Sequence, residues 1–142
     1  MTAVLTLLFL MAAPPASTLD QVKAEANPEH RARVAVDYAA VAEKNAEAAY
    51  AKGDLEALSA ALKMVEESMT MAQESFTTSG KTPWRNPGPY KYAELHSRDL
   101  LIRLSDLELK MDASERDLIT GVKTRVQEIH DAWFEGIMGK KR

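Results

Sequence analysis

The sequence predicts an all-α fold: an antiparallel four-helix bundle, made of two long helical hairpins joined by a Pro-rich loop, after an N-terminal signal peptide. Three observations lead to this prediction. Along four segments, apolar residues recur at spacings of three and four, as on the buried side of a helix. Gly-Asp and Pro-rich breaks separate those segments where two hairpins need connections. Polar and apolar residues nowhere alternate as they do in a β-strand.

Composition narrows the classes of function. A chain of 142 residues, 46% hydrophobic and 27% charged, suits one globular domain. It has no cysteine, which excludes disulfides, thiol nucleophiles and cysteine-ligated metals. Its net charge of -3 gives no general attraction to nucleic acid, so we expect no nucleic-acid partner.

The N-terminus indicates where the protein is located. Residues 3–13 read AVLTLLFLMAA, an apolar run followed by prolines and small residues. Such a run is typical of a secretory signal, whereas a membrane-spanning helix needs about 20 apolar residues. We therefore expect a signal peptide over residues 1–17, a periplasmic or secreted protein, and no stable membrane anchor after cleavage. The alternative is that the run is a buried N-terminal segment of the fold.

The bundle domain is predicted over residues 28–139, after a polar lead at 18–27 and before a basic tail at 140–142. Its first helix, 28–52, begins at an asparagine cap followed by proline. Gly53 and Asp54 end this helix and cap the next one, and so short a connection implies an antiparallel pair. Along the first helix, the residues that recur at helical spacing are Val34, Tyr38, Val41, Asn45 and Ala49.

The second helix, 54–79, has the most regular pattern. Unbroken heptads are expected of a helix that packs nearly parallel to its neighbours. The next segment, KTPWRNPGP at 81–89, holds three prolines and is predicted to be non-helical. The apolar positions of the second helix, spaced 3,4,3,4,3,4, are Leu55, Leu58, Leu62, Val65, Met69, Ala72 and Phe76.

The third and fourth helices are predicted over 90–110 and 113–138. Asp112 with Glu115, or Ser114 with Asp117, would cap the fourth helix. The apolar face of the third is Ser97, Leu100, Leu101, Leu104, Leu107 and Met111, and that of the fourth is Leu118, Ile119, Val122, Val126, Ile129, Trp133 and Ile137.

Three stretches carry a resemblance: NPEHRARVAVD, PYKYAELHSRDLLIRLSDLE and VQEIHDAWFEGIMGKK. Together they resemble an uncharacterised family of small exported bacterial helical proteins. The resemblance covers most of the chain after the signal peptide, and it implies a helical fold and export. It brings no activity and no functional residues.

Sequence motifs for catalysis are missing. No Glu-x-x-His, His-Glu-x-x-His, Cys-x-x-Cys-His or Gly-rich phosphate loop occurs. His30, His96 and His130 lie on or beside three predicted helices, and no spacing requires them to converge. We therefore expect no enzyme, no catalytic residues, no metal site and no cofactor. A weak haem hypothesis rests on His130, whose alternative role is a histidine at the edge of the core.

The loop between the hairpins is one candidate ligand site. It is cationic and aromatic and holds no acid, so it suits an anionic or glycan ligand. The alternative is that Trp84 closes the end of the bundle while prolines stiffen the connection. The candidate residues are Lys81, Trp84, Arg85, Tyr90, Lys91 and Tyr92.

Two further apolar stripes lie opposite the main faces of their helices. Ala57, Met64 and Met71 form one on the second helix, and Leu95, Ile102 and Leu109 form the other on the third. Such stripes either contact a partner or are buried by packing inside the fold. We expect a non-enzymatic binding or scaffolding protein of the cell envelope that self-associates or binds another envelope protein. The alternative is a small-ligand binder at the loop, or a haem protein.

Overall fold

The structure is a computed structural model, and it describes residues 18–139. The predicted signal peptide and basic tail lie outside those residues. Within them the fold is all-helical, without a strand. No helix in this range is both long and apolar enough to cross a membrane. The helices are α1 (Leu19–Lys23), α2 (Pro28–Ala51), α3 (Leu55–Ser79), α4 (Pro87–Lys110) and α5 (Asp117–Met138).

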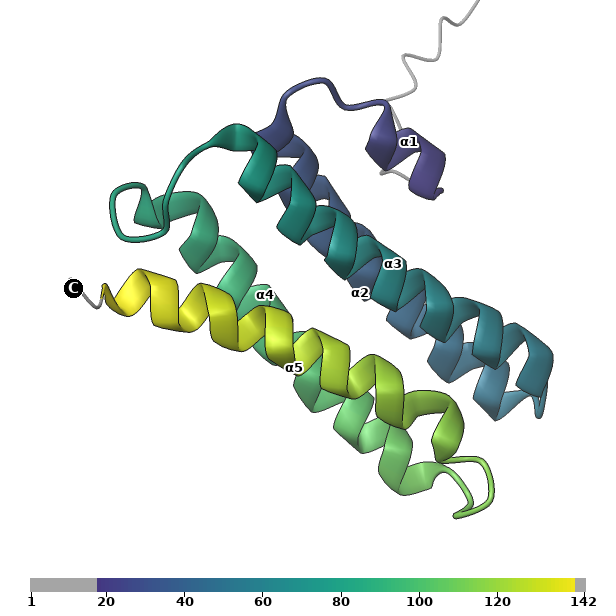
Figure 1. Cartoon of the computed structure of the whole chain (residues 1–142). Coiled ribbons are helices and arrows are strands. Elements are labelled where there is room, and N and C mark those ends of the chain that lie inside the picture. Colours follow the sequence, from purple (N-terminus) through teal and green to yellow (C-terminus); the bar gives the residue numbers. More distant parts are fainter. Residues whose placement is uncertain (1–17, 140–142) are drawn as a thin grey trace, which may run out of the picture.

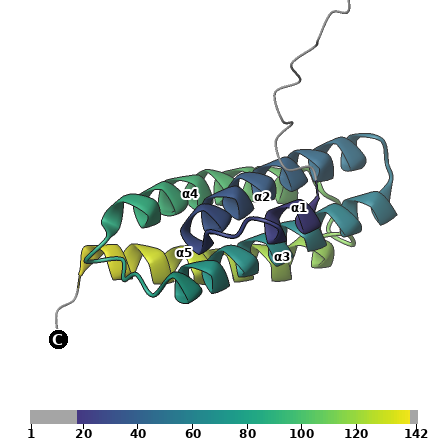
Figure 2. The same ribbon diagram turned by 90° about the horizontal axis from the view of Figure 1, so that it is seen from above.

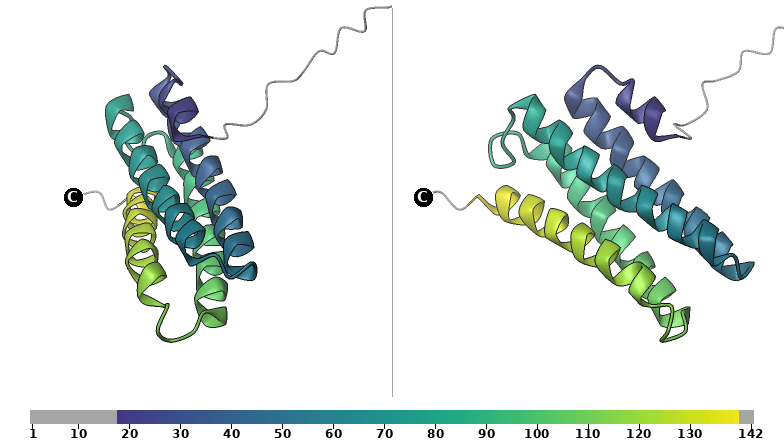
Figure 3. Two further views of the ribbon diagram at one scale, coloured as in Figure 1. Left: turned by 90° about the vertical axis from the view of Figure 1, so that its right-hand side faces the viewer. Right: turned by 45° about the vertical axis from the view of Figure 1, so that its right-hand side comes forward.

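The four long helices pack as a bundle. Helix α2 lies beside α3 and α4 beside α5, and the two pairs meet through α2–α4 and α3–α5 contacts (Figure 1). The α2–α3 and α4–α5 connections lie at one end, while the α3–α4 loop and the end of α5 lie at the other (Figure 3). The predicted breaks are confirmed: Asn27 caps α2, Asp54 caps α3, and Gly80 ends α3 in the left-handed conformation.

The buried face of α2 agrees only in part with the predicted one: Tyr38 and Ala49 are buried and Val34 packs against the core. Val41 is 39% exposed, and Asn45 is exposed as well. Small side chains let the backbones of α2 and α3 approach closely. Helix α3 also contributes small side chains to this contact, the buried Ser68 and Ser75. The face was misjudged because alanine adds little to a hydrophobicity pattern. The residues that form it, spaced 3,4,3,4,3, are Ala32, Ala35, Ala39, Ala42, Ala46 and Ala49.

The predicted heptad face of α3 is buried from Leu58 to Phe76, and only Leu55 in the first turn is exposed. The predicted apolar faces of α4 and α5 also line the core, with Leu101 and Ile137 at its edge. Leu118 is the exception, since it is exposed at the start of α5. The core therefore runs the length of the four helices.

Helix α1 falls within the segment expected to be a polar lead. Thr18 caps it by accepting a hydrogen bond from the Gln21 amide, and Val22 is fully buried. Seen from above, α1 lies over α2 and α3 on the side away from α4 and α5 (Figure 2). One buried valine and a partly buried Leu19 attach this short helix, too few apolar residues to form a recognisable pattern.

Helix boundaries differ in two places. Helix α4 begins at Pro87, inside the segment predicted to be non-helical, because proline needs no hydrogen-bond acceptor in a first turn. Helix α5 begins at Asp117 rather than at 113, after a turn closed by the Glu115 amide on the Asp112 carbonyl at 2.8 Å. Neither predicted capping pair forms, since the capping residue of α5 is Arg116 and its side chain makes no capping hydrogen bond.

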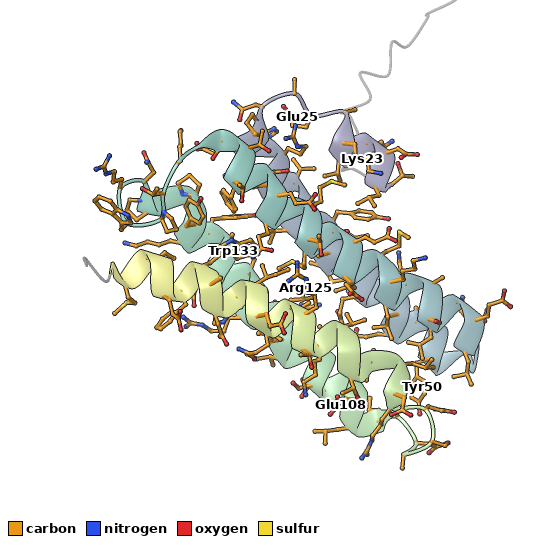
Figure 4. The ribbon with its side chains drawn as sticks, in the orientation of Figure 1. Lys23, Glu25, Tyr50, Glu108, Arg125 and Trp133 are labelled. Carbon is orange, nitrogen blue, oxygen red and sulfur yellow. The ribbon has the colours of Figure 1, made fainter. Side chains whose placement is uncertain are left out.

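Side chains tie the two helix pairs together at both ends and in the middle (Figure 4). At the turn end, the Tyr50 hydroxyl donates a 2.8 Å hydrogen bond to the Lys110 carbonyl. Midway, Arg125 donates to the Gln73 side chain on α3 at 3.2 Å. At the loop end, Phe76 stacks on Tyr90 and meets Trp133 edge-on, with centroids 4.2 and 5.6 Å away.

Candidate functional site

The outer face of α4 carries the most exposed apolar stripe. Leu95, Ile102 and Leu109 are 56%, 55% and 75% exposed. They follow one another at every seventh residue, so they lie in a column that turns only slowly around the helix. The column faces away from the buried Ser97 and Leu104. No other helix of the described chain covers it.

The two edges of this stripe differ in charge. Helical geometry places Arg98 on the edge toward α5 and Asp99 and Asp106 on the edge toward α2. Contacts agree with this placement: Arg98 pairs with Glu94, which reaches α5, and Asp99 pairs at 3.4 Å with Arg103, which reaches α2. The stripe thus has Arg98 on one edge and Asp99 and Asp106 on the other.

The stripe on α3 is not free in the same way. Ala57 is exposed, but Met64 and Met71 are partly buried against the core. Met71 and Leu19 of α1 line one shallow pocket of about 500 Å³, with Glu66 and Glu67 among its other walls. The chain itself therefore covers part of this second face. This agrees with the alternative that such a stripe is buried by packing inside the fold.

The cationic loop does not assemble into one site. Lys81 pairs with Glu29, and its carbonyl accepts a 2.7 Å hydrogen bond from Tyr90, which is buried. Trp84 is 46% exposed, with the Arg85 guanidinium 4.5 Å from its ring centroid. The structure thus holds these candidates in two local groups, and Lys91 is exposed on the first turns of α4.

Tyr92 belongs to a third group, formed with α2. Its hydroxyl donates a 2.5 Å hydrogen bond to Asp37, and the Arg33 guanidinium lies 4.2 Å from its ring centroid. Burial and the Asp37 carboxylate raise the pKa of Tyr92. A pocket of about 280 Å³ opens here between the first turns of α2 and α4, and sequence reasoning missed it because its walls come from segments far apart in the chain. Those walls are Asn27, Glu29, His30, Arg33, Gly88, Pro89 and Tyr92.

The histidines lie in separate contacts. His30 pairs with Glu25 at 2.9 Å, and His96 lies against the ring of Tyr92. His130 has Nε2 3.0 Å from Glu94 and Nδ1 3.1 Å from Asp131. Both ring nitrogens of His130, the residue of the haem hypothesis, therefore lie within hydrogen-bond distance of carboxylates.

Glu94 is almost fully buried between α4 and α5, and sequence reasoning did not single it out. Burial opposes its ionisation, but hydrogen bonds from Arg98 and His130 outweigh that effect and lower the pKa of Glu94. Similar bonds from His130 and Gln127 lower the pKa of Asp131. Among residues 18–139, no three histidine or acidic side chains are arranged to hold a metal ion. The cluster resembles a satisfied interhelical ion pair more than a reactive centre.

Comparison of the chain with models of protein families, with curated proteins and with solved structures finds no match.

Proposed function

We propose that this protein is exported to the cell envelope, folds as an antiparallel four-helix bundle, and acts without catalysis by binding a second copy of itself through the outer face of α4. The proposal of export is supported by the apolar run at residues 3–13. The resemblance to exported bacterial helical proteins is a second reason to propose it.

The observation that carries the proposal is the exposure of Leu95, Ile102 and Leu109. A large aliphatic side chain gains about 1.5–3 kcal/mol when it moves from water to a fully buried position. Contiguous apolar surface on a soluble protein marks an interaction site, whereas scattered single residues do not. A column of three along one helix is the shape that a helix from another molecule covers, and a contact of this size suits a weak, reversible dimer.

The charged edges favour a second copy in parallel orientation. In a parallel pair related by a two-fold axis along α4, Arg98 of each copy lies level with Asp99 of the other. In an antiparallel pair centred on Ile102, Asp99 of each copy lies level with Asp106 of the other, which places like charges together twice. The parallel pair therefore buries the apolar stripe and also places opposite charges next to each other along its edges.

Light scattering across a concentration series tests self-association. We expect a concentration-dependent dimer, and we expect Leu95→Ser with Ile102→Ser and Leu109→Ser to abolish it while the circular dichroism spectrum keeps its helical signal. The matched control places serine at Val41, Leu55 and Leu118, which are exposed outside the stripe. A monomeric wild-type protein at all concentrations would overturn the proposal.

Orientation can be read from cross-linking, because the chain has no cysteine of its own. A parallel pair brings identical positions together, so Leu95→Cys should cross-link to itself on oxidation. An antiparallel pair places those two positions about 21 Å apart, beyond the reach of a disulfide, and only Ile102→Cys would then cross-link to itself.

A further inference from the structure

Glu43 is a carboxylic acid on α2, at the edge of the alanine face that lies toward Arg103 of α4. It is fully buried, one turn away from Ala39 and Ala46 of that face. Neither of its carboxyl oxygens has a hydrogen-bond partner within the described chain. A buried polar group without a partner destabilises a fold, most of all when it is charged. Its presence at this position therefore requires a reason.

One cation approaches Glu43 without closing a bond. Nη1 of Arg103 on α4 lies 3.9 Å from Oε2 of Glu43, too far for a hydrogen bond. Arg103 also pairs with Asp99 on the exposed side of α4. It thus spans the α2–α4 contact from the buried acid to a solvent-exposed one.

The other charged groups that act on Glu43 lie on its own helix. Glu47, one turn further along α2, disfavours a negative charge there, whereas Lys44 and Arg103 favour it. No charged group of α3 or α5 is among those that shift it. Burial is the largest influence, and with Glu47 it raises the pKa of Glu43 to about 7.

A solvent-filled pocket lies close to the buried Glu43 carboxyl. An open pocket of about 780 Å³ lies between the last turns of α2 and α4, and its walls include Glu47, Tyr50 and Leu107. Glu43 lies one turn from Glu47, so a small separation of α2 from α4 would extend this pocket to the buried carboxyl.

We propose that Glu43 makes the α2–α4 contact a proton-operated latch: the neutral acid stays buried and the contact is closed, and the ionised acid moves toward Arg103 and the neighbouring pocket and loosens the contact. This inference is independent of self-association, because it concerns the face of α4 toward α2 rather than the outer stripe.

The direction of the pH effect follows from linkage. The folded chain holds the Glu43 proton more tightly than the unfolded chain, whose ordinary value is 4.5. The stabilisation is therefore complete below about pH 4.5 and is lost as the pH rises through about 7. In that window the Glu43 contribution to the folding equilibrium should fall by up to about tenfold per pH unit.

Hydrogen exchange of the full chain between pH 5 and 9, corrected for the intrinsic effect of pH on exchange, tests the latch. We expect protection of the α2 and α4 amides around Glu43 and Arg103 to fall at least tenfold on going to the higher pH. Amides at the α3–α5 contact should change much less. Glu43→Gln should remove the fall, and Glu47→Gln, the matched change one turn away, should shift it to lower pH without removing it, because Glu47 raises the pKa of Glu43.

A second measurement keeps the test valid if Glu43→Gln folds poorly. The carbon-13 shift of the wild-type Glu43 carboxyl should titrate near pH 7, in step with the loss of protection. Titration near 4.5, protection that does not depend on pH, or an unchanged fall in Glu43→Gln would each overturn the proposal.

Discussion

Pro83 rests directly on Gly136. A Cβ atom on Gly136 would lie 2.7 Å from Cγ of Pro83, closer than real side chains approach. Beside this contact, the Trp84 Cβ lies within van der Waals distance of the position a Cβ would take at Gly139. The α3–α4 loop is therefore seated on the bare backbone at the end of α5.

Two glycine substitutions in α5 should distinguish the effect of this contact on stability from the effect of helix propensity. Glycine to alanine inside a helix gains about 0.5–1 kcal/mol. Gly121→Ala should show this gain because nothing lies within 4 Å of the new Cβ. Gly136→Ala should instead be at least about 1 kcal/mol less stable than Gly121→Ala, since the methyl group displaces Pro83. Urea denaturation measures both, and equal stabilities would show that the loop yields freely.

The two asparagine caps make a second matched pair. Asn27 accepts a 3.0 Å hydrogen bond from the His30 amide, while Asn86 at the start of α4 makes no side-chain bond. Asn27→Ala should therefore cost about 0.5–2 kcal/mol of unfolding free energy. Asn86→Ala should change it much less. A larger loss at Asn86 would contradict the capping geometry.

Removing the Tyr50 hydroxyl should weaken the turn end of the bundle. Its bond to the Lys110 carbonyl joins α2 to α4, so Tyr50→Phe should cost about 0.5–1.5 kcal/mol. Tyr38→Phe is the control, because the Tyr38 hydroxyl makes no bond within residues 18–139. Thermal unfolding of the two variants should differ, and matching midpoints would mean that water replaces the Tyr50 bond without loss.

Glu94 should respond to pH in the opposite direction to Glu43. Its pKa lies below the ordinary value of 4.5, so its ion pairs stabilise the fold above that pH and are lost as the pH falls through the lowered value. Glu94→Gln should therefore lose about 1–3 kcal/mol at pH 7. The difference from wild type should shrink in acid.

The control for Glu94 is Asp131→Asn. Asp131 also contacts His130 but is exposed, so solvent can replace its bonds. Stability curves from pH 3 to 8 give both results. A Glu94→Gln difference that does not shrink between pH 8 and pH 3 would show that lost packing, rather than lost charge, weakens the variant.

The sequence by itself determined the helices and most of their inner faces. The 3,4 spacing from Leu58 to Phe76 follows from the period of the α-helix, and Asn27 and Gly53–Asp54 act on hydrogen bonds only a few residues away. These features depend only on nearby residues in the chain, so the sequence predicts them without knowledge of the tertiary contacts. The same holds for the stripe from Leu95 to Leu109, whose column is a property of one helix.

The tertiary structure decided whether the second apolar stripe of α3 and that of α4 are covered by another part of the chain. Met71 is half-covered because it packs against the core and lies beside Leu19 of α1, whereas Leu109 is exposed. Likewise, α2 turns its alanines inward because close packing rewards small side chains, which no hydropathy pattern records. The burial of Glu43 and Glu94 depends on groups from other helices, Arg103 and His130, that lie 60 and 36 residues away in the chain. Desolvation and charge pairing act through space, and so the chemistry of these acids was set by packing rather than by sequence spacing.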